Sequence, residues 1–298
     1  MTDISTKKLC ELQKLHIEEK YIDNFRWQTI TERNSFVLNM VNDLSAKQMK
    51  IVYSFASMIE DFSNPKPLEM NIRDLLSVLG LTHGGENRKR LKDELLDLRS
   101  KSFWVNTVMD DNKKAESAVG IVDKVDVTST DCYLTFSSYM YEQLGFENGD
   151  YYTPLLGTIL ALKQKYIMSL YRFLAAEAYK GSTSISIDEL RRITECTNKF
   201  LNDREFTRSV VKNGVDKINQ FGDISVTFKK FKKSGKTAGY TFFIMGKTRY
   251  ESMLAMLAAK CEIEGRHITI EDYLNDLSKK HQLEELGAVF GEKKSSEN

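Results

Sequence analysis

The sequence of 298 residues is poor in proline, in paired cysteines and in long apolar runs. It has only three prolines and no low-complexity segment, so we expect a chain that is folded nearly throughout. Its four cysteines (Cys10, Cys132, Cys196 and Cys261) form no CxxC pair, which indicates free thiols and a reducing, cytoplasmic compartment. No apolar run approaches the roughly 18–20 residues of a membrane span. The N-terminus also lacks the hydrophobic region of a signal peptide, so we expect no membrane association.

Sequence signatures of catalytic sites are absent as well. Residues 235–237 and 246–248 both read GKT, like the end of a P-loop. The earlier glycine that a P-loop needs is replaced by Lys230 and Thr241, so neither stretch should bind phosphate in that way. The four histidines are never at ligand spacing, and the His-x-His motif of rolling-circle nickases does not occur. We therefore predict no enzymatic activity, no metal and no cofactor.

The net charge of +1 hides an uneven distribution of charge along the chain. Residues 151–250 contain 18 Lys and Arg against 8 Asp and Glu, a net charge of +10. Residues 34–150 have a net charge of −5, and residues 251–298 have a net charge of −4. A basic block between acidic neighbours is typical of a single domain that contacts a polyanion.

The basic block contains the pattern of two successive helices. Ser186 and Glu189 predict a capping box at the start of the first helix. The second has an apolar stripe at helical spacing beside basic residues that are four apart and share one face. The stripe consists of Phe206, Val210, Val211, Val215 and Ile218, and the basic residues are Arg204, Arg208 and Lys212.

A basic β-hairpin is predicted directly after these helices. Ile224, Val226 and Phe228 alternate as in a strand, and residues 240–244 form its partner. The predicted turn between them carries Lys229, Lys230, Lys232, Lys233 and Lys236. Helix, basic helix and basic hairpin are the order of a winged helix-turn-helix, which reads double-stranded DNA. Composition alone leaves open a small α+β unit with a solvated, lysine-rich face.

The same order of elements occurs earlier in the chain. Residues 71–75 and 186–190 share a helix cap, an apolar residue, a charge and a leucine. A long amphipathic helix precedes each, at 45–62 (with Ser45 and Gln48 as a capping box) and at about 157–179. The remaining elements expected in the first copy are a helix at 86–101, strands at 103–108, 118–127 and 133–136, and a helix at 139–144.

We therefore predict an α+β fold with two tandem winged-helix domains and additional terminal helices. The expected parts are an N-terminal helical arm (1–33), a first winged-helix domain (34–150), a second (151–246) and a helical tail (247–298) whose end is disordered. The apolar segment 137–156 should pack the two domains against each other.

The second domain should make the main contact with DNA. We expect five side chains near the major groove, where Arg and Lys read guanine edges: Asn202, Arg204, Thr207, Arg208 and Lys212. The five wing lysines should follow the phosphates, which adds affinity without sequence information. A second, weaker contact should come from one flank of the helix at 86–101, through Arg88, Lys89, Lys92 and Arg99.

The second domain resembles the C-terminal winged helix of theta-type plasmid replication initiators, the Rep3 superfamily. The resemblance rests on ordered short motifs: Leu190-Arg191, Lys199-Phe200, Phe206-Thr207-Arg208, Val210-Val211, Asp216-Lys217-Ile218-Asn219, Asp223-Ile224 and Phe242-x-Ile244. The first copy resembles the N-terminal winged helix of the same family, so that the resemblance covers residues 33–246. Phe200 stands where the family pattern has tyrosine, and residues 250–298 have no recognised counterpart.

This resemblance implies a protein that binds repeated sequences, called iterons, at a plasmid or phage origin. It also implies melting of an adjacent AT-rich segment and recruitment of the host initiator and the replicative helicase. Family members repress their own gene as homodimers, largely through the first winged helix. Two other readings stay open: a winged-helix repressor without a role in replication, and a structural or segregation adaptor in which DNA binding is incidental. Direct repeats beside the gene would favour the initiator, and one inverted repeat at its promoter would favour the repressor.

Overall fold

The computed structural model describes residues 20–39, 41–108, 113–144 and 151–266. The first unit consists of β1 (Glu32–Arg33), α2 (Asn34–Asn39), β2 (Val41–Asn42), α3 (Ala46–Ala56), β3 (Leu68–Asn71), α4 (Ile72–Val78), α5 (Gly85–Leu98), β4 (Ser102–Val108), β5 (Lys114–Gly120), β6 (Val122–Val127), β7 (Asp131–Phe136) and α6 (Ser138–Leu144).

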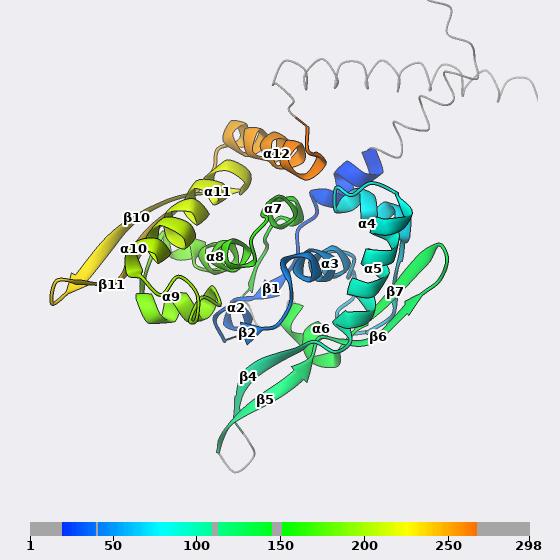
Figure 1. Ribbon diagram of the computed structural model, residues 1–298, viewed down its shortest axis with the longest axis horizontal. Coiled ribbons are helices and arrows are strands. Elements are labelled where there is room, and N and C mark those ends of the chain that lie inside the picture. The colour runs from blue at the N-terminus through cyan, green and yellow to red at the C-terminus, as the bar shows by residue number, and fades with distance from the viewer. Residues whose placement is uncertain (1–19, 40, 109–112, 145–150, 267–298) are drawn as a thin grey trace, which may run out of the picture.

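The second unit repeats the order of helix, strand, two helices and hairpin. It consists of β8 (Tyr151–Tyr152), α7 (Leu156–Ala161), α8 (Lys165–Ala176), the 3-10 turn η1 (Ala178–Lys180), β9 (Ser182–Ser186), α9 (Ile187–Ile193), α10 (Asp203–Phe206), the π-helical stretch η2 (Thr207–Lys212), α11 (Asn213–Phe221), β10 (Ile224–Lys233), β11 (Lys236–Gly246) and α12 (Arg249–Glu264). The two units lie side by side, with α7 and α8 between them (Figure 1).

The sheet topology confirms that the two units are copies of one winged-helix motif. In each, the strand that precedes the short helix pairs with the last strand of the hairpin. The first unit has the order β3-β7-β6 and the second the order β9-β11-β10, with all pairs antiparallel. The predicted caps are also present, because Ser45 and Gln48 bond reciprocally and Asn71 caps α4. Of the capping box predicted at Ser186, one hydrogen bond is present, in which its hydroxyl accepts from the Glu189 backbone N–H. The Glu189 carboxylate accepts from Arg192 instead of from the Ser186 backbone.

The strand predicted at 118–127 is wrong, because it divides into β5 and β6. The break falls at Ile121, which is fully buried and whose backbone bonds to Lys101 and Ser137 instead of continuing a ladder. The strand β5 therefore pairs with β4 in a separate sheet, β2-β4-β5. The hairpin that corresponds to the wing of the second unit is β6–β7, and β4–β5 is an additional hairpin (Figure 1).

Two predicted helices are shorter than their apolar patterns indicated. The helix predicted at 45–62 ends at Ala56, and the one predicted at 157–179 divides into α7 and α8 around an extended Leu162. Every residue of α7 is buried, so its apolar pattern comes from burial on all sides and not from one helix face. The Leu160 carbonyl at its end accepts a hydrogen bond from the Lys50 ammonium group of α3.

The described part of the N-terminal arm, residues 20–33, packs into the core. Only residues 20–26 of the described arm are helical, and residues 1–19 lie outside the described part. Phe25 and Ile30 are buried, and β1 pairs with β8 across the two units. The predicted helix over 1–33 is therefore wrong beyond residue 26, because the chain turns there into extended backbone that pairs with residues 151–155.

The helix α12 ties the two units together. It packs against α7 and α11 of the second unit, and its Lys260 lies 2.6 Å from the Asp23 carboxylate of the arm. Glu264 accepts a hydrogen bond from the buried Arg26, which also bonds the last carbonyls of α4 in the first unit. A Cβ atom at Gly80 would lie 2.0 Å from the Ile263 carbonyl oxygen, so the first unit touches the α12 backbone. The part of the tail predicted at 267–298 lies outside the described residues.

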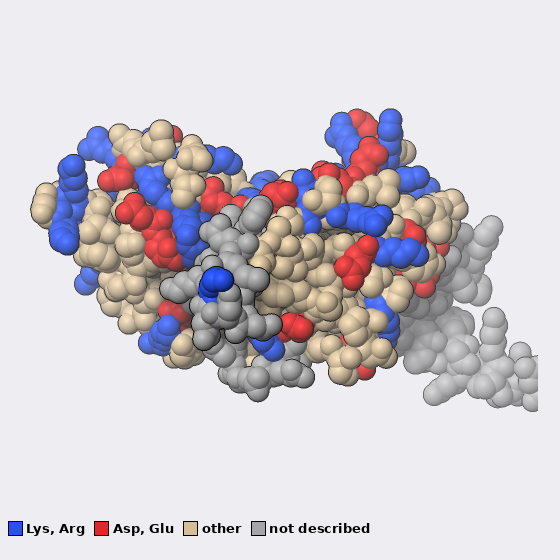
Figure 2. All heavy atoms as spheres, turned by 90° about the horizontal axis from the view of Figure 1, so that it is seen from below, with Lys and Arg blue, Asp and Glu red and all other residues tan. Residues whose placement is uncertain are grey.

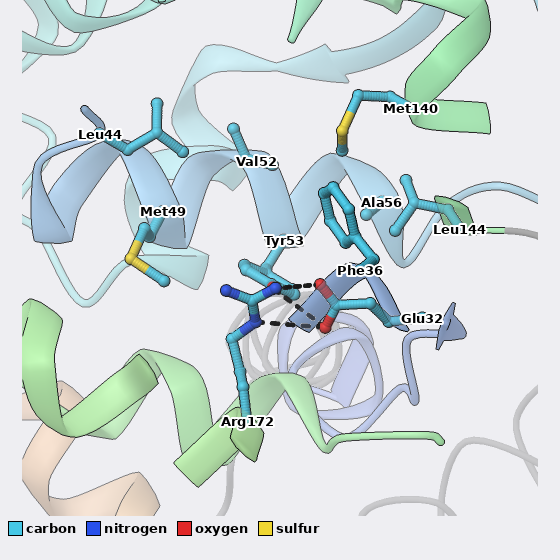
Figure 3. A pocket seen from close by; sticks show the side chains of 10 residues that line it. All are labelled: Glu32, Phe36, Leu44, Met49, Val52, Tyr53, Ala56, Met140, Leu144 and Arg172. Carbon is cyan, nitrogen blue, oxygen red and sulfur yellow. Dashed lines mark hydrogen bonds and ion pairs between the residues drawn. The ribbon is translucent and has the colours of Figure 1, made fainter. Parts of the chain in front are cut away.

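A buried polar cluster also joins the units (Figure 3). The guanidinium group of Arg172, on α8, donates two hydrogen bonds to the Glu32 carboxylate, on β1. The hydroxyls of Tyr53 and Tyr152 donate to the same carboxylate, and burial raises the pKa of both phenols, which keeps them protonated. The adjoining apolar cavity measures about 10 Å³, which is room for one water molecule and not for a ligand.

Candidate nucleic-acid interface

The candidate recognition helix runs without interruption from Asp203 to Phe221 through α10, η2 and α11. All five residues of its predicted apolar stripe are buried. Gly214 allows a close approach to α8, because a Cβ atom there would lie 2.6 Å from Leu170 Cδ2. The stripe thus fixes the helix against α8 and leaves its opposite face in solvent.

Three basic side chains lie on that solvent face. Arg204, Arg208 and Lys212 are all exposed, as the spacing predicted. An α-helix turns about 100° per residue, so positions four apart drift by about 40° around its axis. The wider π turn, in which the Asn213 N–H donates to the Arg208 carbonyl, takes more residues per turn and counteracts this drift. The π-helical stretch therefore keeps the three charges in a straighter row along the helix.

The N-terminal end of the helix is held by one buried arginine, Arg191 of α9. Its guanidinium group donates to the carbonyls of Lys199 and Phe200 and lies 4.3 Å from the centre of the Phe206 ring. It also pairs with Asp203, the first residue of α10. The loop between α9 and α10 is therefore fixed to the helix that it introduces.

Two of the predicted groove residues have structural contacts in this region. The Asn202 side chain is exposed and caps the helix by accepting from the backbone N–H groups of Arg204 and Glu205. Thr207 is only 8% exposed, and its hydroxyl is shared between the Asp203 carbonyl and the Tyr240 hydroxyl. Thr207 therefore faces the core side of the wing and not the row of basic side chains.

The wing is longer than the sequence predicted. Its lysines lie on the strands β10 and β11, and the turn itself is Ser234-Gly235, whose two positive φ angles are typical of a type I′ hairpin. The alternating strand and the partner strand at 240–244 are confirmed. The predicted lysine turn is wrong because the ladder continues past Phe228 to Lys233.

The wing lysines are exposed but do not share one face. Lys230 pairs with Tyr240, which faces the helices, whereas Lys229 pairs with Thr241 on the outer face. The Lys229 ammonium lies 5.6 Å from the centre of the outward Phe243 ring. Lys232, Lys233 and Lys236 surround the tip. Lys and Arg side chains gather at this end of the molecule in Figure 2.

The predicted second contact lies on the helix α5 of the first unit. Arg88, Lys89, Lys92 and Arg99 are all exposed, while the leucines of the opposite face are buried. The Arg88 guanidinium group donates to the Ser129 carbonyl at the tip of the β6–β7 hairpin, which connects this helix to its own wing. By its place between α4 and the β6–β7 hairpin, α5 corresponds in the first unit to the helix 203–221 in the second.

Sequence reasoning missed two residues of this region. Leu201 is 77% exposed directly before the helix cap, although it is a large apolar residue. Arg191 was used only as part of a family motif, and its buried bonds to the loop were not expected. The position of Arg191 inside an apolar helix pattern could have predicted these bonds, because buried arginines are usually paired.

The described residues contain no group of three or more His, Cys, Asp or Glu side chains placed to hold a metal ion. Within the same residues, no helix has both the length and the apolar character needed to cross a membrane. Burial raises the pKa of the Cys132 thiol to about 12 and also raises that of Cys196, so both are poor nucleophiles.

Comparisons with known proteins agree with this architecture. Residues 29–175 match the family model Rep3_N (Initiator Replication protein, WH1), and residues 186–244 match Rep3_C (Initiator Rep protein, WH2). The chain is similar to the crystal structure of Pi initiator protein in complex with iteron DNA, with 19% sequence identity and a TM-score of 0.61 over 75% of this chain and 99% of that one. It also matches domains 2 and 3 of RctB, with 12% identity and a TM-score of 0.43 over 66% of this chain and 80% of that one. No curated protein matches the sequence. The α+β fold of two tandem winged helices is confirmed.

Proposed function

We propose, since this chain belongs to the Rep3 family of initiator replication proteins, that it initiates replication by binding repeated, double-stranded origin DNA. One observation carries the proposal for DNA. A buried apolar stripe fixes the helix 203–221 and leaves Arg204, Arg208 and Lys212 exposed on it. The Pi initiator, which shares the fold, was crystallised with iteron DNA. We therefore propose iterons as the sequences that this helix reads.

The proposed contacts follow from exposure and chemistry. Arg204 and Arg208 would bind guanine edges in the major groove, with Lys212 further along the helix and Asn202 at its start. Lys230 and the lysines of the wing tip would contact phosphates on the helix side of the hairpin. Thr207 is left out of the interface because its hydroxyl is committed to Tyr240. Lys229 lies on the outer face, so it would add positive charge to the wing and not a direct contact with a phosphate.

The first unit would supply the weaker contact and the contacts with proteins. Its flank on α5 would enter a second major groove, while its acidic balance of −5 over residues 34–150 suits protein partners. In this proposal the first domain spans 34–150 and also forms the homodimer that represses the gene. The host initiator and the replicative helicase would be recruited in the cytoplasm, and no reaction would be catalysed.

The proposal can be tested with the DNA that flanks the gene. Fluorescence anisotropy should show that the protein binds a duplex of the direct repeats much more tightly than a shuffled duplex of the same composition. A replicon that carries only the repeats should be maintained in cells that supply the protein. Equal affinity for both duplexes, or maintenance without the protein, would contradict the proposed function.

Arg208→Ala should weaken binding to the cognate repeat by about 1–3 kcal/mol and affect random DNA much less, because a guanidinium group on guanine discriminates between bases. Anisotropy titrations on both duplexes measure this difference. Lys217→Ala is the matched control, since it removes one charge from the same helix at a side chain that instead bonds Gln220 and lies over the Phe221 ring. Equal losses on both duplexes would mean that Arg208 contacts phosphate only.

A further inference from the structure

Leu201 is 77% exposed, more than any other large apolar residue whose side chain the structure describes. A single exposed leucine is common on protein surfaces and carries no meaning by itself. Its place makes it informative, because it directly precedes Asn202, the cap of the helix 203–221. The residues at the N-terminal end of a recognition helix are those that contact base edges.

The backbone at Leu201 is held by contacts on its inner side. The Phe200 carbonyl accepts a hydrogen bond of 2.9 Å from Arg191, whose guanidinium group is buried behind the loop. Phe200 has a positive φ of 52°, a conformation that only surrounding contacts hold in place for a bulky residue. Its ring packs edge-on against Tyr166, with 5.4 Å between ring centres. Phe200 therefore points inward, and the next side chain is directed into solvent.

A leucine can recognise only one feature of a base edge in the major groove. It has no hydrogen-bonding atoms, so it cannot distinguish guanine, cytosine or adenine by donors and acceptors. The exception is thymine, whose 5-methyl group is the apolar feature of that groove. Contact between leucine and this methyl group removes both from water, which is favourable.

On the basis of the proposed function, we propose that Leu201 contacts the 5-methyl group of a thymine in the repeat and so selects T·A at one position. Arg191 is the positioning residue, because it holds the loop that presents Leu201. This contact adds an apolar element to a reading surface that otherwise consists of charged and amide side chains.

The test replaces each thymine of the repeat, one at a time, with deoxyuridine, which lacks only the methyl group. The full-length protein should lose about fourfold in affinity at one thymine, or at two adjacent ones, as expected for one buried methyl group. Leu201→Ala should bind the thymine repeat about as weakly as the wild type binds the deoxyuridine repeat, and should be insensitive to deoxyuridine at that position. All other thymines should behave alike in both proteins.

Two further variants serve as controls. Leu96→Ala removes another exposed leucine, on α5, and should keep the sensitivity of the wild type to deoxyuridine. Arg191→Lys keeps a cation but loses the planar contacts to the loop, so it should reduce the effect of deoxyuridine without changing the salt dependence of binding. If the Arg191→Lys variant instead changed the salt dependence of DNA binding, Arg191 would contact a phosphate and its positioning role would be overturned.

Identical deoxyuridine profiles for the wild type and Leu201→Ala would overturn the methyl contact, even if the protein prefers its repeat over random DNA. If the wild type shows no preference for its repeat over random DNA, the proposed function itself is contradicted. Leu201→Ala should retain the thermal midpoint of the wild type, because the side chain is exposed, so that a change in binding does not reflect misfolding.

Discussion

Replacing Lys230, Lys232, Lys233 and Lys236 together with alanine should weaken binding to every DNA sequence by a similar factor. The plot of log affinity against log salt concentration should lose about 3 to 4 units of slope, because each lysine on a phosphate releases about 0.9 counterion. The loss should therefore be largest at low salt. Titrations of one repeat and one random duplex at several salt concentrations measure both quantities.

The structure offers two controls for this experiment. Lys229→Ala removes one wing charge on the outer face and should change the slope less than a substitution at the tip. Lys66→Ala removes an exposed charge of the first unit and should leave the slope unchanged. If the variant with all four lysines replaced kept the salt-dependence slope of the wild type, the wing would not contact DNA.

Arg172→Met should destabilise the folded protein by about 3–5 kcal/mol, because it leaves the Glu32 carboxylate buried without its cation. The pair is almost completely inaccessible, with side-chain exposures of 3% and 0%. Glu32→Gln should also destabilise, since it leaves the guanidinium group without its anion. Urea denaturation of the full chain measures each free energy of unfolding.

The double variant separates the pair from simple loss of packing. Arg172→Met combined with Glu32→Gln should be more stable than the sum of the two single losses implies, because neither charge is then left unpaired. As a matched control, Lys124→Met breaks an exposed ion pair with Asp126 at 2.7 Å and should cost less than about 1 kcal/mol. Strictly additive losses at Arg172 and Glu32 would show that the pair is not coupled.

The parts of the fold that depend on local pattern could be predicted from the sequence. The stripe from Phe206 to Ile218 reports burial directly, because its helical spacing is the packing surface itself. The Ser45 and Asn71 caps also follow from the sequence, because each cap contacts residues within one turn. For the same reason, the exposed row from Arg204 to Lys212 could be located without a structure.

Features that depend on distant residues could not be predicted. The break at Ile121 and the extra β4–β5 hairpin are set by contacts with other strands, which a continuous apolar pattern does not show. Arg172 and Glu32 are 140 residues apart, and no local signal connects them. The buried hydroxyl of Thr207 contacts that of Tyr240, which lies 33 residues further along the chain. The exposure of Leu201 follows from Arg191 and the backbone angle of Phe200, which sequence spacing does not reveal.

The arrangement of the two units decides what DNA geometry one chain can read. The β1–β8 pair, the Arg172–Glu32 pair and the contacts of α12 fix the units to each other within one chain. Because the two copies lie on one chain and differ in sequence and charge, a single chain should read an asymmetric site. This is the central claim, since a repressor of two-fold symmetry would need two chains on a palindrome.

Hydroxyl-radical footprinting of the monomer on a single repeat tests this claim most directly. Protection should cover two successive major grooves on one face of the duplex, about 10–10.5 base pairs apart, with the stronger protection at the second unit. The full-length variant with alanine at Arg88, Lys92 and Arg99 should protect one groove only. Substitution is preferred to deletion of the first unit, because deletion would leave β8 and Arg172 without partners. A symmetric footprint on a palindrome that requires two chains would contradict the account.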